Sequence, residues 1–260
     1  SSSTSNPIPR TYSTVLRHLL NRTNYERIRV VKFDDKAFKL DRMRKLLKKL
    51  GNPQDGLRTI HVAGTVGKGS TTSMAANMLK QCGFTVGTFT SPHLVEITER
   101  IAINDAPISE SNFTSLMREV IQAADQIDKG MTYFELLTAA ALKHFADQAV
   151  DIAIVEVGLG GRLDSTNVIT PEITVITTID LDHTRLLGSS VEEIAKEKAG
   201  IMKPGVPCYS VPQAPAVADV LREHAEATGC PLSIVGTDIE FSNRFCVSDD
   251  LGPHTRICLI

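Results

Sequence analysis

From residue 57 to residue 235, short apolar runs alternate with longer stretches of helical periodicity, and this alternation is the strongest constraint on the fold. The runs 151–158 and 173–179, DIAIVEVG and ITVITTI, are continuously apolar and rich in branched residues, which is typical of strands covered on both faces. Further strands are predicted at 57–64, 84–90, 206–211 and 232–235. The pattern predicts an α/β fold with a doubly wound, mainly parallel sheet.

Helices are predicted between these strands and before the first of them, at 11–26, 38–51, 70–83, 109–127, 132–148, 191–200 and 214–229. Ser109 or Ser111 is the expected cap of the fourth. The helix at 132–148 is apolar on nearly all sides, so we expect it to be buried. The end of the chain, 238–260, predicts two strands of a meander. We divide the chain into a helical segment packed on the core, residues 1–50, and an α/β domain, residues 51–260.

The composition is that of an ordinary globular protein, with 42% apolar and 22% charged residues and a net charge of -2. Residues 10–49 hold 13 Lys or Arg against four acids, which indicates solvated helix faces or a basic rim that attracts an anionic substrate. The five cysteines include no CxxC pair, and no run approaches the roughly 18 apolar residues of a membrane span. We expect a cytoplasmic protein without nucleic-acid or membrane partners.

The stretch 60–71, IHVAGTVGKGST, follows a strand and begins a helix, as a phosphate loop does. It departs twice from the pattern GxxxxGK followed by Ser or Thr, because Val62 replaces the first glycine and Gly69 follows Lys68. We still expect residues 64–71, called the phosphate loop below, to bind a nucleotide, although a tight turn without a ligand is the alternative. The expected binding residues are Gly64, Thr65, Gly67, Lys68, Gly69, Ser70 and Thr71.

Polar residues also follow two other strands, at the sheet edge where ligands collect in such folds. Glu156 ends an apolar run, so it predicts a cation nearby, either magnesium on a nucleotide or a lysine. After it, glycines allow close backbone approach, and Arg162 and Asp164 are expected at the rim. A surface ion pair is the alternative role of Arg162. Asp180, Asp182 and His183 follow the next strand. The segment 89–101, FTSPHLVEITERI, reads as a loop at the same edge.

Helical spacing in 191–202 places Lys198 on the inward, apolar face. Glu192, Glu193, Lys196 and Glu197 are expected to point outward. An inward lysine either extends to the rim or is a functional amine whose pKa is lowered by burial.

Six strings occur in order from about residue 12 to about residue 212: GTVGKGST, TSPHL with ERI, TYFELLTAAAL, EVGLGGRLDSTNV, LDHTRLLG and EEIAKEKAGIMKPG. Together they resemble the dihydrofolate synthase/folylpolyglutamate synthase family of the Mur ligase superfamily. The resemblance implies an ATP-dependent ligase of the Mur central-domain type. Such an enzyme phosphorylates the carboxylate of a pteroate or folate to an acyl phosphate, which the amino group of L-glutamate then attacks. It also implies small-molecule substrates only and a monomer.

The resemblance further implies roles for individual residues. The phosphate loop binds ATP, and Lys68, His183 and Lys198 are the implied catalytic residues. Two Mg²⁺ sites are implied, the first held by Ser91 and Glu156 and the second by His183, with Lys198 as a carbamate near it. The implied substrate-binding residues are Thr132, Phe134, Arg162 and Asp164.

Two residues depart from the family pattern: Val66 stands where Asn or Lys is frequent, and Asp180 where Gly is usual. We also expect the C-terminal ligase domain of the family to be absent. The alternatives are a non-catalytic ATP- or folate-binding domain, another Mur-type amide ligase, or an ATP-dependent carboxylase-type synthetase. The sequence leaves open which of the two folate activities is present.

Overall fold

The computed structural model describes residues 8–25, 40–182, 184–248 and 252–259, without the side chains of residues 185 and 241–259. Its centre is an eight-stranded sheet of order β4-β3-β2-β5-β1-β6-β7-β8. Six neighbouring strands are parallel: β2 (Val86–Phe89), β5 (Ile152–Glu156), β1 (Thr59–Ala63), β6 (Ile173–Ile176), β7 (Cys208–Ser210) and β8 (Leu232–Ile234). The predicted α/β fold with a mainly parallel sheet is confirmed.

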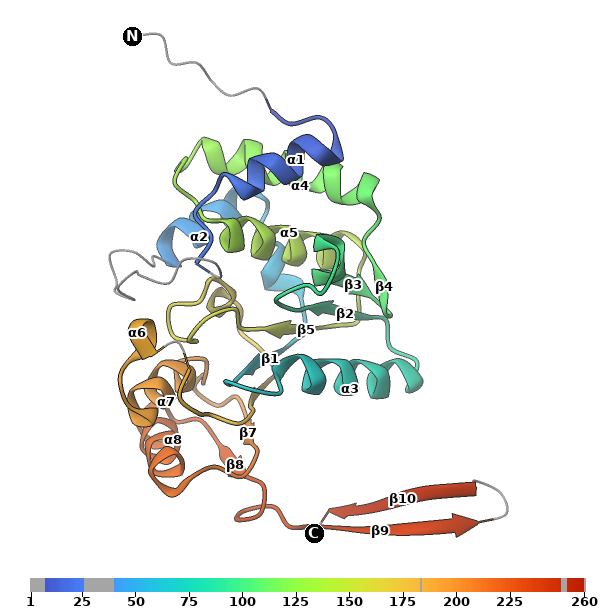
Figure 1. Ribbon diagram of the computed structural model, residues 1–260, viewed down its shortest axis with the longest axis vertical. Coiled ribbons are helices and arrows are strands. Elements are labelled where there is room, and N and C mark those ends of the chain that lie inside the picture. Colours follow the sequence, from blue (N-terminus) through green and yellow to red (C-terminus); the bar gives the residue numbers. More distant parts are fainter. Residues whose placement is uncertain (1–7, 26–39, 183, 249–251, 260) are drawn as a thin grey trace.

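Helices cover both faces of this sheet (Figure 1). The side chains of β5 alternate, so Ile152 and Ile154 pack toward α3 (Lys68–Gln81) while Ala153 and Val155 pack toward α5 (Tyr133–Asp147). On the same face as α5, α7 (Val191–Ala199) and α8 (Pro215–Thr228) cover β6 and β7. Burial on both faces explains why the central strands read as continuous apolar runs.

Three helices form an outer layer over α5: α1 (Tyr12–Leu20), α2 (Leu40–Lys49) and α4 (Glu110–Asp125). As predicted, α5 is buried on nearly all sides, and Ser109 rather than Ser111 caps α4. The prediction that the first helix continues to residue 26 is wrong, because the chain turns after Leu20 and brings Arg22 to Asp125 at the end of α4. The domain boundary at residue 50 stays a prediction.

Two antiparallel edge strands were not predicted, β3 (Ile101–Ile103) and β4 (Ala106–Pro107). With three and two residues they are too short to show a period of two. Asn104 and Asp105 join them, and both residues have positive φ. This Asn-Asp dipeptide is the one local feature that could have predicted the hairpin turn. The short helices are η1 (Pro53–Gly56), η2 (Ile97–Arg100), η3 (Ser165–Val168) and α6 (Thr184–Leu187). Thus the segment 89–101 is a loop only in part.

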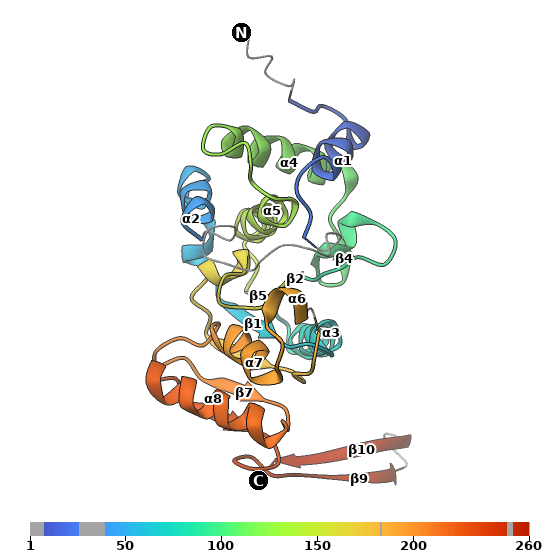
Figure 2. The same ribbon diagram turned by 60° about the vertical axis from the view of Figure 1, so that its left-hand side comes forward.

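The predicted meander is present as a hairpin of β9 (Phe241–Ser248) and β10 (Gly252–Leu259). In both views it extends away from the eight-stranded sheet (Figures 1 and 2). Among the described residues, no helix is both long and apolar enough to cross a bilayer.

The strand register brings the predicted site residues to one edge. Val62 lies opposite Glu156 on β5, and Ala63 lies opposite Ile176 on β6. The three segments that follow β1, β5 and β6 therefore leave the sheet at the same level, at its carboxyl edge.

Candidate functional site

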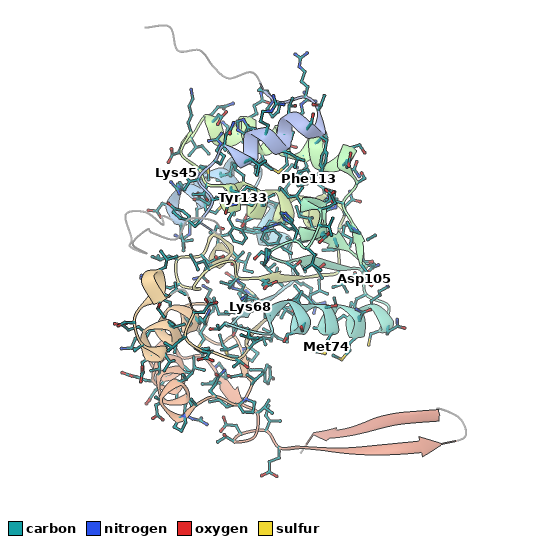
Figure 3. All side chains as sticks on the ribbon, viewed as in Figure 1. Lys45, Lys68, Met74, Asp105, Phe113 and Tyr133 are labelled. Atoms are coloured by element: carbon teal, nitrogen blue, oxygen red, sulfur yellow. The ribbon has the colours of Figure 1, made fainter. Side chains whose placement is uncertain are left out.

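The phosphate loop leads directly into α3, which begins at Lys68 rather than at the predicted Ser70. Thr71 makes the first backbone bond of the helix, from its N to the O of Gly67, 2.9 Å away. The N–H groups of Lys68, Gly69 and Ser70 precede that bond and have no acceptor within the helix. Lys68 lies at this amino end of α3, near the middle of the molecule (Figure 3). The arrangement is suited to an anion.

The loop is fastened to the segment that follows β6. A Cβ on Gly64 would lie 1.7 Å from Thr177 Oγ1, so only glycine fits there. Thr65 N donates to Thr178 O at 2.8 Å, and the Thr65 hydroxyl donates to Asp180 O at 3.0 Å and accepts from Asp180 N at 3.1 Å. Asp180 thus holds the loop through its backbone. Val66, the other departure from the family pattern, has a side chain that is 64% exposed.

Lys68 and Glu156 face each other across the loop. Lys68 Nζ donates to Gly64 O at 3.2 Å and Thr65 O at 3.4 Å, and lies 3.9 Å from Glu156 Oε1. Glu156 Oε2 accepts from Ser91 N at 3.2 Å. Burial raises the pKa of Glu156 to about 7, against the opposing effects of Lys68 and the Ser91 N–H. The lysine expected near Glu156 is present, but it does not offset the burial of the carboxylate.

Glu156 and Ser91 fit a hard divalent cation. Both offer oxygen atoms, and Glu156 is only 3% exposed, so a cation would offset the cost of its burial. No group of three or more His, Cys, Asp or Glu side chains gathers among the residues that the structure describes. A magnesium ion there would depend on nucleotide and water oxygens for its other ligands. His183 lies outside the described residues.

Lys198 lies on the inward face of α7, as predicted, and is 5% exposed. Its Nζ does not extend to solvent but donates to Gly64 O at 2.7 Å. Burial, followed by the charge of Lys68, lowers the pKa of Lys198 to about 8. The amine therefore contacts the phosphate loop at Gly64 O, the carbonyl that Lys68 also contacts. The expectation that Glu197 points outward is wrong, because Arg162 draws its partly buried carboxylate back into an ion pair at 3.0 Å.

Residues 158–161, called the glycine loop below, are packed on both sides. A Cβ on Gly158 would lie 2.4 Å from the Phe134 ring, and one on Gly161 would lie 2.6 Å from Glu197 O in α7. The loop thus joins α5 to the helix that holds Lys198. Arg162, which follows it, forms the surface ion pair that was one of its two expected roles.

The prediction that Asp164 lies at the rim is wrong, because this residue is buried and only 4% exposed. It caps η3: its Oδ1 accepts from Thr166 N and from the Thr166 hydroxyl, while Oδ2 accepts from Leu159 N at 2.8 Å. Burial raises the pKa of Asp164, and these hydrogen bonds act in the opposite direction. The correction has a physical reason, since the turn after the glycine loop folds its backbone donors onto this carboxylate.

Two pockets meet at the glycine loop. The large pocket has a volume of about 360 Å³ and the small pocket about 30 Å³. Thr132, Phe134 and Asp164 line the large pocket, and Lys198 lines the small one. Five residues line both: Thr65, Lys68, Gly158, Leu159 and Asp182. The two pockets thereby bring together eight of the predicted residues: Gly64, Thr65, Lys68, Ser91, Thr132, Phe134, Asp164 and Lys198. Six other described residues of the prediction line neither pocket: Gly67, Gly69, Ser70, Thr71, Glu156 and Arg162.

Two charged residues of the large pocket were not predicted, Arg42 and Glu135. Arg42 Nε donates to Glu135 Oε1 at 2.6 Å, and Glu135 Oε2 accepts from the N and the hydroxyl of Thr132, each at 2.8 Å. Thr132 and Glu135 have the spacing of a capping box, and this sequence pattern could have predicted that Glu135 lies beside Thr132. Arg42 lies within a basic helix, where nothing in the sequence distinguishes it from its neighbours.

Comparison with known proteins agrees with this geometry. The Mur ligase middle domain family matches residues 62–243. The dihydrofolate synthase/folylpolyglutamate synthase of Bacillus subtilis is 47% identical over 197 residues, which cover 74% of this chain and 46% of that protein. The chain belongs to the dihydrofolate synthase/folylpolyglutamate synthase family. It spans about half the length of the curated relatives it matches.

Solved structures of this folate-ligase family have the same fold. A Mycobacterium tuberculosis folylpolyglutamate synthase complexed with ADP superposes with a TM-score of 0.82 at 32% identity, covering 95% of this chain and 54% of that one. A folylpolyglutamate synthase complex with AMPPCP and folate superposes with a TM-score of 0.80 at 35% identity, covering 91% of this chain and 57% of that one. Both likenesses extend over nearly all of this chain.

Proposed function

We propose that this chain forms the ATP and acyl-substrate sites of a ligase that adds L-glutamate to dihydropteroate or a folate. The observation that supports this most directly is the shared wall of the two pockets. Lys68 and the glycine loop line both, so a phosphate held by the phosphate loop and a carboxylate held in the large pocket would meet beside Lys68. Bringing two reactants together in this way is the main requirement of acyl activation.

The phosphate loop binds the ATP phosphates in this proposal. The free N–H groups at the start of α3 donate to the phosphate oxygens, and Lys68 exchanges its contacts with Gly64 O and Thr65 O for the terminal phosphates. The related structures with ADP and with AMPPCP support a nucleotide here.

The large pocket binds the pteroate or folate. Phe134, stacked on Phe89 with ring centroids 5.5 Å apart, offers an aromatic wall, and Thr132 and Asp164 complete it. The substrate carboxylate attacks the γ-phosphorus of ATP and ADP leaves. The amino group of glutamate then attacks the acyl phosphate, and phosphate and a proton are released.

Glu156 and Ser91 would hold a Mg²⁺ ion, which neutralises phosphate charge during the transfer. Lys198 is proposed to become a carbamate, because carbamylation needs a neutral amine and burial lowers the pKa of Lys198 to about 8. Carbon dioxide would add to Nζ with loss of one proton. His183 stays a predicted ligand of a second ion. In a crystal structure with nucleotide bound, density extending beyond Nζ is expected, and an unmodified amine still bonded to Gly64 O would count against the carbamate.

Phosphate release tests the function in a full-length protein that contains this chain. We expect release to require ATP, L-glutamate and either dihydropteroate or a folate, and to be abolished by Lys68→Ala with little change in melting temperature. Release that needs neither acyl substrate nor glutamate would overturn the proposal. Release by the full-length protein but not by residues 1–260 would make this chain a binding domain. The cytoplasmic location, the monomeric state and the absence of nucleic-acid and membrane partners stay predictions.

A further inference from the structure

One buried polar residue has no part in the proposed chemistry. His61 lies in the middle of β1, three residues before the phosphate loop, and its side chain is 0% exposed. Its Nε2 lies 2.8 Å from Thr166 Oγ1 in η3. Its Nδ1 has no hydrogen-bond partner within the described residues. A central strand rarely carries a buried imidazole with one unpaired nitrogen, so the contact with Thr166 needs a reason.

The contact with Thr166 is the first link of a chain of hydrogen bonds. The Thr166 hydroxyl bonds to Asp164 Oδ1, and Asp164 Oδ2 accepts from Leu159 N in the glycine loop. The N–H of Gly158 helps to lower the pKa of this carboxylate. The chain therefore runs from the centre of β1 to the loop that separates the large pocket from the small one.

The direction of these bonds follows from counting protons. Two backbone N–H groups, those of Leu159 and Thr166, donate to the two oxygens of Asp164, so it accepts as a carboxylate. The one hydroxyl proton of Thr166 then goes to Asp164, and Thr166 can only accept from His61. The imidazole proton is thus on Nε2. The reverse order would place an unpaired N–H donor at Nδ1 in the core, which costs more than an unpaired lone pair.

We propose that His61 is a positioning residue: by donating from Nε2 to Thr166, it fixes the Asp164 carboxylate and, through it, the backbone of the glycine loop. Because β1 also leads into the phosphate loop, one strand then sets the spacing between the nucleotide and the acyl substrate. This role depends on the proposed function and adds a residue to it.

Two substitutions at the middle link test the proposal in a full-length protein that contains this chain. Thr166→Val keeps the shape and removes the hydroxyl, whereas Thr166→Ser keeps the hydroxyl. We expect Thr166→Val to raise the KM for the acyl substrate about tenfold or more while the KM for ATP changes less than about twofold. Thr166→Ser should stay within about threefold of the unmodified protein in both constants.

A loss of stability alone could also lower activity, so Ser109→Ala is the control. It removes the cap of α4, outside the two pockets, and should leave both KM values unchanged. Equal KM values for Thr166→Val and the unmodified protein would overturn the proposal. So would an equal loss in Thr166→Val and Thr166→Ser.

Histidine ¹⁵N NMR of the unsubstituted 260-residue chain tests the proton position without any variant and without turnover. We expect the His61 signals of a neutral ring protonated at Nε2 throughout pH 6–8. A ring protonated at Nδ1 would overturn the proposal even if the ligase activity is present. Conversely, a protein that releases no phosphate with an acyl substrate and glutamate would refute the ligase function, and the NMR result would still decide the hydrogen-bond direction.

Discussion

Gly64 and Gly69 both belong to the phosphate loop, but their surroundings differ. A Cβ on Gly64 would overlap Thr177, and φ is +154° there. A Cβ on Gly69 would meet only Glu156 Oε2, at an ordinary 3.8 Å, in the first turn of a helix. At the scale of single residues, the fold therefore requires glycine at position 64, whereas it does not require glycine at position 69.

Gly64→Ala should lower the free energy of unfolding by about 2 kcal/mol or more, because either Thr177 or the loop must move. Gly69→Ala is the matched control and should leave it unchanged or slightly raised, since alanine favours the helix. Urea denaturation of both variants measures the difference. Equal losses of stability would contradict the steric reason given for Gly64.

His61 should make the protein sensitive to acid. Burial, with a contribution from Lys203, lowers its pKa to about 3, whereas an unfolded chain binds that proton near pH 6.5. The stability due to the neutral ring is complete above pH 6.5 and is lost as the pH falls toward 3. The free energy of unfolding lost in this way between pH 7 and pH 5 is about 2 kcal/mol. Urea denaturation at pH 7 and at pH 5 should show that His61→Gln loses less stability between these pH values than the unsubstituted protein. An identical loss in both proteins would contradict a lowered pKa for His61.

At the scale of elements, the sequence predicts what repeats and misses what depends on a single contact. The alternation of strands and helices predicted the parallel sheet because each central strand is covered on both faces. By contrast, β3 and β4 are too short to have a period. The ion pair of Glu197 with Arg162 depends on how two distant segments meet, and no local pattern contains that information. The burial of Asp164 depends on how one glycine-rich turn folds, and the period of strands and helices says nothing about such a turn.

The caps of α4 and α5 offer a test of how an element serves the site. Ser109 and Thr132 each accept from a backbone N–H at 3.2 Å, so Ser109→Ala and Thr132→Ala should each cost about 1 kcal/mol of stability. Only Thr132→Ala removes part of the large pocket. Calorimetry should show weaker binding of dihydropteroate by that variant alone. Weakening by both would mean that the effect is one of stability.

At the scale of the whole molecule, two of the three hydrophobic cores in the described residues meet along the middle of the sheet, on the face away from α3. One contains residues of α1, α2, α4 and α5 with Phe89 and Val155, and the other contains residues of α7 and α8 with Ala63 and Ile176. The phosphate loop and the glycine loop lie where these cores adjoin. A ligand bound there contacts both halves, so it should stabilise the chain as a unit.

Mg·ATP at about 100 times its Kd should raise the free energy of unfolding of the 260-residue chain by about 2.7 kcal/mol. EDTA should remove most of this gain if Glu156 and Ser91 hold the ion with the nucleotide. Lys68→Ala should show little gain at the same concentration. Thermal unfolding with and without nucleotide makes the measurement, and an undiminished gain in Lys68→Ala would exclude the phosphate loop as the site.

The division into two cores also bears on how such a chain can diversify. Apart from Ala63, the second core is drawn from residues 157–230, whereas the first is drawn from residues 15–169. Substitutions among the residues of the first core around Phe134 therefore leave most of the packing behind Lys198 unchanged, and the glycine loop is the segment that contacts both. A lineage can in this way change the walls of the large pocket while the side of the small pocket stays constant.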